Sequence, residues 1–109
     1  MSVLSRLKVK SNDGFVELSA DDLTLKLGEC EARNILEWLE QAIHTSLLFL
    51  LKVDCPGFEI EGRNYDDYLD FLVFVHNDGE MSARTFIVPK TQASSFFQEL
   101  DRAVATAFA

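Results

Sequence analysis

Three aspartates, Asp66, Asp67 and Asp70, come nearest in this chain to a catalytic or metal-binding set. Carboxylate oxygens are the ligands that Mg²⁺ and Ca²⁺ prefer, and a pair of carboxylates performs glycoside hydrolysis. On an extended strand, however, Asp66 and Asp70 share one side while Asp67 faces the other. The spacing also fits no EF-hand loop. We therefore interpret the three as a solvated strand entry and predict no metal site.

The other reactive residue types do not form a catalytic set either. Neither His44 nor His76 has an acid, a serine or a cysteine at motif spacing. Cys30 and Cys55 lie far apart without a C-x-x-C motif, a pattern typical of two free, reduced thiols. The five glycines form no phosphate-binding loop. We expect a protein that is not an enzyme and that needs no cofactor.

The segment from Asp54 to Glu80 concentrates the acidity of the chain. It holds eight acids and one base, Arg63, whereas the net charge of all 109 residues is −8. The acids are Asp54, Glu59, Glu61, Asp66, Asp67, Asp70, Asp78 and Glu80. Interleaved aromatic residues are Phe58, Tyr65, Tyr68, Phe71 and Phe74. Aromatic anchors beside carboxylates suit a surface that grips a basic protein partner. The alternative is a solvated face that only maintains solubility.

The strand pattern divides this acidic segment into three parts. Residues 54–70 form a loop-rich approach to the sheet, residues 69–75 are core, and Asp78 with Glu80 belongs to a hairpin tip. The candidate site is therefore shorter than the run of charge. The predicted partner-binding residues are Tyr65, Asp66, Asp67, Tyr68 and Asp70, together with Glu59 and Glu61.

Length and composition set the class of protein. A chain of 109 residues with 48% hydrophobic residues predicts one globular domain over residues 1–109. The charge of −8 disfavours direct binding to nucleic acid and to anionic membranes. The first ten residues, MSVLSRLKVK, do not resemble a secretory signal, and the longest apolar run is too short to span a bilayer. We expect a cytoplasmic protein.

Periodicity in the first half predicts three strands and a helix. Alternating residues predict strands over 3–10, 15–18 and 23–27, with a hairpin at Asn12-Asp13-Gly14. A helix follows Gly28, and its apolar stripe runs from Ile35 to Ile43. Residues 46–52, SLLFLLK, fit either an extension of that helix or a buried strand. Leucine richness without β-branched residues slightly favours the helix.

The second half predicts further strands and a closing helix. Strands are expected over 58–61, 68–76 and 82–88, with a hairpin at Asn77-Asp78-Gly79 and a helix after Pro89. Residues 68–76 are apolar on both sides, as in a central strand. The predicted order is β-β-β-α-β-β-β-α. It indicates an α+β fold with a mostly antiparallel sheet of five or six strands backed by two helices.

Two further hypotheses follow from this order. The helical patterns at 32–43 and 93–104 align, and an Asn-Asp-Gly hairpin precedes each helix, which leads to the hypothesis of an internal duplication of a β-hairpin–helix unit. Two helices cover one face of such a sheet. Leu72 and Phe74, on the other face, then need cover from the 47–51 segment, a partner protein or a second copy.

Two families resemble this chain. The stretch YLDFLVFVHNDG over 68–79, followed by FFxxL over 96–100, resembles small acidic immunity proteins of bacterial toxin systems. This resemblance implies an inhibitor that occludes the active site of a toxin, with acids set against a basic nuclease surface. Small phage-borne inhibitors of defence proteins share its size and acidity. Either implies the cytoplasm of a bacterium or of a phage host cell.

The second resemblance is to type III secretion chaperones, which are also small, acidic and α+β. Their order of three strands, a helix, two or three strands and a closing helix is similar to the predicted order here. The chain departs from them by opening on a strand rather than on a helix. This resemblance implies a homodimer that binds an extended segment of an effector.

Overall fold

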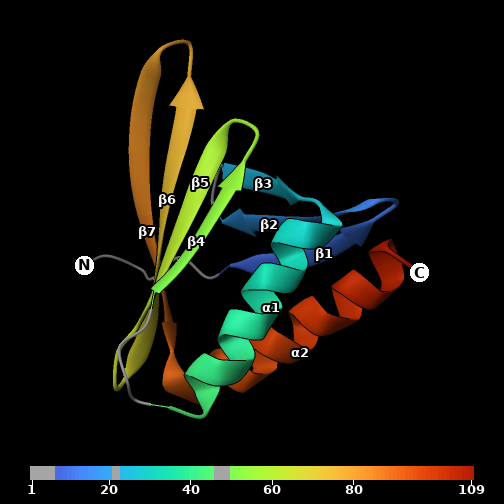
Figure 1. The fold of residues 1–109 in the computed structure, drawn as a ribbon, viewed down its shortest axis with the longest axis vertical. Helices are drawn as coiled ribbons and strands as arrows, with labels where there is room; N and C mark the ends of the chain where they lie inside the picture. Colours follow the sequence, from blue (N-terminus) through green and yellow to red (C-terminus); the bar gives the residue numbers. More distant parts are fainter. Residues whose placement is uncertain (1–6, 21–22, 46–49) are drawn as a thin grey trace.

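The computed structural model describes residues 7–20, 23–45 and 50–109 of the chain. Within these ranges the backbone forms seven strands and two helices (Figure 1). They are β1 (Lys8–Asn12), β2 (Phe15–Ala20), β3 (Leu23–Leu27), α1 (Glu29–Ile43), β4 (Leu50–Cys55), β5 (Phe58–Asn64), β6 (Tyr68–Asn77), β7 (Glu80–Pro89) and α2 (Lys90–Ala107). The α+β class, the two helices and the antiparallel pairing of the strands confirm the prediction.

The strands form two sheets rather than one. The first has the order β1-β2-β3, and the second has the order β4-β5-β6-β7. Every pair is antiparallel, so short hairpins join neighbouring strands. In the β6–β7 hairpin both turn residues have positive φ, 50° at Asp78 and 81° at Gly79. These angles define a type I′ turn, for which Asp-Gly is a preferred pair.

Helix α1 begins after Gly28, and Glu29 and Glu31 in its first turn complement the helix dipole. Its last turn holds no basic residue. A cation reaches this end from elsewhere in the chain, because Nζ of Lys90 donates hydrogen bonds to the carbonyl oxygens of Ala42 at 2.8 Å and Thr45 at 3.3 Å. Lys90 thereby fixes the end of α1 to the junction of β7 and α2.

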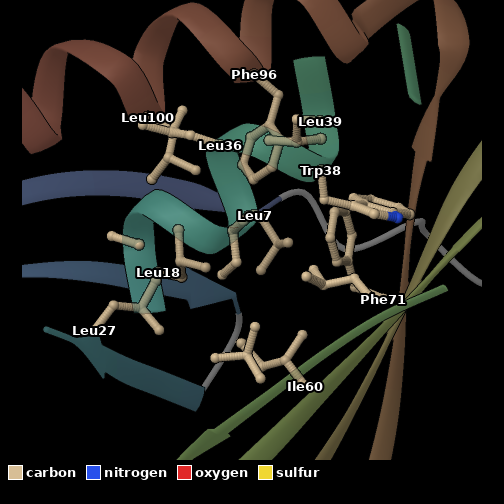
Figure 2. Packing of buried hydrophobic residues seen from close by; sticks show 14 of the residues in the cluster. Leu7, Leu18, Leu27, Leu36, Trp38, Leu39, Ile60, Phe71, Phe96 and Leu100 are labelled. Carbon is tan, nitrogen blue, oxygen red and sulfur yellow. The ribbon is translucent and has the colours of Figure 1, made fainter. Parts of the chain in front are cut away.

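One hydrophobic core joins both sheets and both helices. The buried faces of the sheets turn toward α1 and α2, and the two helices pack against each other. Figure 2 shows Trp38 of α1 beside Phe71 of β6, with Leu18 and Leu27 of the first sheet beneath α1. The rings of Trp38 and Phe71 meet edge to face at 5.5 Å, and Phe71 meets Phe96 of α2 at 6.0 Å. Phe71 therefore links both helices to the second sheet.

For residues 46–52 the sequence left a helix extension and a buried strand open, and the slight preference for the helix is wrong where the structure describes them. Leu50, Leu51 and Lys52 belong to β4, not to an extension of α1. The alternation continues through Val53, so Leu51 and Val53 are buried while Lys52 is exposed. Tertiary burial against α1 here overrides the helix propensity of leucine. Residues 46–49 lie outside the described part of the chain.

The added strand changes the predicted architecture. The observed order is β-β-β-α-β-β-β-β-α, with strands divided between sheets of three and four instead of one sheet of five or six. Internal duplication stays a prediction: each half places antiparallel strands before a helix, but the two halves differ in strand number. The β6 strand lies between β5 and β7, which confirms its predicted central place.

Candidate functional site

The second sheet has a side turned away from the helices, which we call the outer face. Directly opposed residues of paired antiparallel strands share a side, so the register assigns each residue to one face. Phe71 is buried on the inner side together with its partners Gly62 and Phe86. The outer face consists of Leu50, Lys52, Asp54, Glu59, Glu61, Arg63, Tyr68, Asp70, Leu72, Phe74, His76, Met81, Ala83, Thr85, Ile87 and Pro89.

Apolar side chains dominate the half of the outer face formed by β6 and β7. Leu72, Phe74 and Ile87 are half-buried there, and Met81 is 61% exposed. Neither described helix lies over this face, because both pack on the inner side (Figure 1). Leu50 is in β4, two strands from Leu72, so the described part of the leucine-rich segment does not provide the cover.

Charged side chains occupy the half formed by β4 and β5. Asp54 lies opposite Glu59, and Lys52 lies opposite Glu61. Arg63 of β5 lies opposite Asp70 of β6. The face thus carries four carboxylates and two cations, and it is less acidic than the 54–80 segment suggests. The carboxylates of Glu61 and Asp70 each have a cation as cross-strand neighbour.

The turn between β5 and β6 extends this face. The rings of Tyr65 and Tyr68 stack with centroids 4.8 Å apart, and the Tyr65 N–H donates to the Tyr68 carbonyl at 3.0 Å. Asp66 and Asp67 are exposed at the tip of this turn. The N–H of Lys90 donates to the Asp67 carbonyl at 2.9 Å, which fixes the turn to the start of α2. Two backbone hydrogen bonds therefore hold the turn that carries the tyrosine pair.

Arg63 organises the charges beside the tyrosine pair. A hydrogen bond and charge interaction with Tyr65 raise the pKa of Arg63 above its usual value, and the carboxylates of Asp70 and Glu61 raise it further. Within the described part of the chain, Oδ1 of Asp70 is buried without a hydrogen-bond partner. At the other end of the face, Nε2 of His76 lies 3.8 Å from Oε1 of Glu59.

The structure brings the predicted site residues together on one surface. Glu59, Glu61, Tyr68 and Asp70 share the outer face, and the turn carries Tyr65, Asp66 and Asp67 beside it. The sequence interpretation missed Ile87 and Lys52. The alternation within residues 82–88 contained the signal for Ile87, since it has the opposite parity to the buried Phe86 and Val88. Lys52 could not be placed on a face while its segment stood open between a helix and a strand.

The structure contains few features of a catalytic or metal centre in the ranges it describes. No group of three or more His, Cys, Asp or Glu residues there is arranged to hold a metal ion. A shallow hollow of about 130 Å³ opens at the β4–β5 edge of the outer face, lined by Leu50, Leu51, Lys52, Glu61, Gly62 and Arg63. No described helix is long and apolar enough to cross a membrane.

The two cysteines are free thiols in different environments: Cys30 is exposed and Cys55 is half-buried. Burial, followed by the charges of Glu31 and Asp54, raises the pKa of Cys55 from 9.0 to about 11. Iodoacetamide attacks the thiolate, so at pH 9 we expect Cys55 to be alkylated more slowly than Cys30 in the folded protein. Peptide mass spectrometry over a time course measures both rates. Equal rates would contradict the shielding of Cys55.

The same pKa has a consequence for stability. Between about pH 9 and 11 the unfolded chain has lost the Cys55 proton while the folded chain keeps it, so stability falls as the pH rises. Cys55→Ser should remove this contribution and flatten the profile relative to wild type. Urea unfolding at pH 8 and pH 10.5 measures the difference between the two proteins.

Comparison with known proteins places no family on this chain. No family model matches it, and no curated protein matches it. Among solved structures, it is similar to a protein from Prochlorococcus sp. NATL2A described as a protein with unknown function from the DUF155 family. The two share 5% sequence identity with a TM-score of 0.48, and the match covers 94% of this chain and 95% of that chain. A likeness of this size assigns no function.

Proposed function

We propose that this chain is a non-catalytic domain that binds a protein carrying a basic surface, and that it acts as an inhibitor of that protein. The observation that carries the proposal is the composition of the outer face. Half-buried Leu72, Phe74 and Ile87 lie on a side of the sheet that no described helix covers, and a charged half borders them.

This division follows the anatomy of protein interfaces. An apolar, aromatic-containing centre supplies the energy of association, while a charged rim supplies specificity and encounter rate. Phe74 lies opposite Glu59, and Leu72 lies opposite Glu61, so each apolar anchor has a carboxylate beside it. A partner that inserts an apolar side chain over Phe74 can place a lysine or an arginine on Glu59 in the same contact.

The charge of the region selects the class of partner. Asp66 and Asp67 at the exposed turn add two carboxylates to the four of the outer face, against the two cations Lys52 and Arg63. A basic surface therefore gains attraction over the whole contact, and its association is salt-sensitive because exposed charges are screened. Occlusion of a basic active site, as in toxin–immunity or defence–inhibitor pairs, is the mode of action we propose.

Capture of a partner tests this function. Immobilised wild-type protein should retain a basic protein from lysate of the source cells at low salt and release it at about 0.5 M salt, where the screening length is only a few ångströms. The test variant Glu59→Gln/Glu61→Gln should lose most of that protein. The retained protein, identified by mass spectrometry and purified, should then bind the test variant at least about tenfold more weakly than wild type.

The matched control removes two charges elsewhere. Glu37 and Glu40 are exposed on α1, on the opposite side of the second sheet from the outer face. Glu37→Gln/Glu40→Gln therefore changes the net charge by the same amount and should leave capture unchanged. Equal loss in both double variants would indicate non-specific attraction to an acidic protein and would refute the outer face as the site.

A further inference from the structure

The β6–β7 hairpin fixes the direction of the backbone groups along β7. In a two-residue type I′ hairpin the residues that flank the turn, Asn77 and Glu80, form a hydrogen-bonded pair. Even-numbered residues of β7 therefore direct their N–H and C=O groups toward β6, and odd-numbered residues direct theirs away. Two hydrogen bonds agree with this parity: Lys90 N–H donates to Asp67 on the β6 side, and His76 N–H donates away from β7 to Gly57.

The outward edge of β7 is open among the described strands, because β7 is the last in the order of its sheet. The hairpin reaches beyond the other strands (Figure 1), and its residues from 76 to 83 are all exposed. Edge strands are protected from other chains by charged side chains, especially lysine, by proline or by bulges. β7 carries two charged residues, Glu80 and Arg84, and its proline is only at the last position, Pro89, while its pairing with β6 has no bulge. A two-stranded ribbon of this kind is only marginally stable by itself.

We propose that two copies of this chain pair antiparallel along β7 and join their four-stranded sheets edge to edge. Outward backbone groups must meet outward groups, so odd-numbered residues pair with odd-numbered residues. When the two-fold axis passes through Ser82, Met81 pairs with Ala83 of the second copy. In the same register Glu80 lies directly opposite Arg84 of the second copy, and the symmetry repeats this pair.

The charges on β7 favour a second copy of this chain as the strand that pairs with it, and they also favour one register of that pairing. Residues 80–89 carry one acid, Glu80, and one base, Arg84, so β7 is a neutral strip on a chain with a net charge of −8. A second copy can approach there without facing a like charge. Moving the axis to Arg84 would set the two guanidinium groups opposite each other, which destabilises a cross-strand pair. The Ser82 register instead provides two oppositely charged pairs and brings the exposed Met81 side chain beside Ala83.

The dimer goes beyond the proposed function, because its formation requires no partner protein. In this register residues 80–84 of the two copies overlap, and the two-fold axis turns both outer faces to the same side, so that one dimer presents the binding surface twice. Failure of the two ideas is distinguishable: the mass of the isolated protein tests the dimer, and capture of a basic protein tests the outer face.

Sedimentation equilibrium over about a hundredfold range of concentration up to about 1 mM tests the dimer. Wild type should approach twice the monomer mass of 12.3 kDa. Ala83→Pro removes an outward N–H in each copy but keeps the ladder to β6, and proline is tolerated on an edge strand in this position. It should weaken association about 30-fold, since two hydrogen bonds are lost and a ring obstructs the second copy. Circular dichroism checks that the variant is folded.

Charge reversal tests the register and does not depend on proline. Glu80→Arg and Arg84→Glu should each weaken association, because each sets like charges opposite one another twice. The double variant Glu80→Arg/Arg84→Glu restores opposite charges and should recover most of the wild-type association. A wild-type mass of 12.3 kDa at every concentration would overturn the proposal, as would a dimer that neither Ala83→Pro nor the single reversals weaken.

Discussion

Replacing Phe71 by alanine should lower the free energy of unfolding by about 3–5 kcal/mol, a large part of the stability of a domain of this size. Phe71 is 3% exposed and contacts Trp38 of α1 and Phe96 of α2 at the same time. Its removal leaves a cavity between both helices and the second sheet, and it eliminates two edge-to-face ring contacts. Neither helix can fill the space without leaving its contact with the other.

The matched control for this prediction lies on the same strand. Phe74→Ala removes the same side chain from the outer face, where it is only half-buried, and should cost less than about 2 kcal/mol. Urea unfolding followed by the fluorescence of Trp38, the one tryptophan of the chain, compares the variants at equal protein concentration. Equal losses at the two positions would contradict the assignment of Phe74 to an uncovered face.

The two phenylalanines also show how far the sequence could predict this fold. Alternation along residues 68–76 predicts that Phe71 and Phe74 lie on opposite sides of one strand. The Asn-Asp-Gly turns located two hairpins, because such turns need positive φ that these residues adopt at low cost: Gly14 in the first hairpin, and Asp78 with Gly79 in the second. Strand alternation and turn residues depend on neighbours only a few positions away, so they can be identified directly from the sequence.

Residues 50–53 show where local information stops. Leu50 and Leu51 are in β4 because Leu51 is buried against α1 and the residues of β5, and no neighbour in sequence reports that burial. Because β4 was not identified as a strand, the division into two sheets could not be predicted either, since β4 is an edge strand of the second sheet. Non-local burial decided both features, and it overrides a propensity difference of a few tenths of a kcal/mol.

The candidate site follows the same rule. The acids and tyrosines at residues 59–70 could be identified from composition, and the structure brings them to one surface. Lys52 and Ile87 join that surface only through the register of β4 with β5 and of β6 with β7. The sequence therefore predicted the acidic part of the face, whereas Lys52 and the full extent of the apolar half depend on pairings between distant residues.

Valine at position 62 should destabilise the fold by about 2–3 kcal/mol and displace Trp38. A Cβ atom at Gly62 would lie 3.1 Å from Cβ of Leu51 and 3.1 Å from Cη2 of Trp38, closer than ordinary van der Waals contact. The absence of a side chain at Gly62 is what lets the indole of α1 approach the backbone of β5. Valine adds two methyl groups to this contact, so α1 must move away from the second sheet or Trp38 must change rotamer.

Two further variants isolate the steric origin of that loss. Glu61→Val places the same side chain on the adjacent residue of β5, facing the open outer face, and should change stability by less than about 1 kcal/mol. Leu51→Ala keeps Cβ but removes Cδ2 of Leu51, which would lie 3.3 Å from a Cβ atom at position 62. The double variant Leu51→Ala/Gly62→Val should therefore be more stable than the sum of the two single losses predicts, by about 1 kcal/mol. Urea unfolding gives each free energy, and the emission maximum of Trp38 reports its exposure. Strict additivity, with an unchanged emission maximum in Gly62→Val, would show that the close approach of α1 to Gly62 does not hold the helix on the sheet.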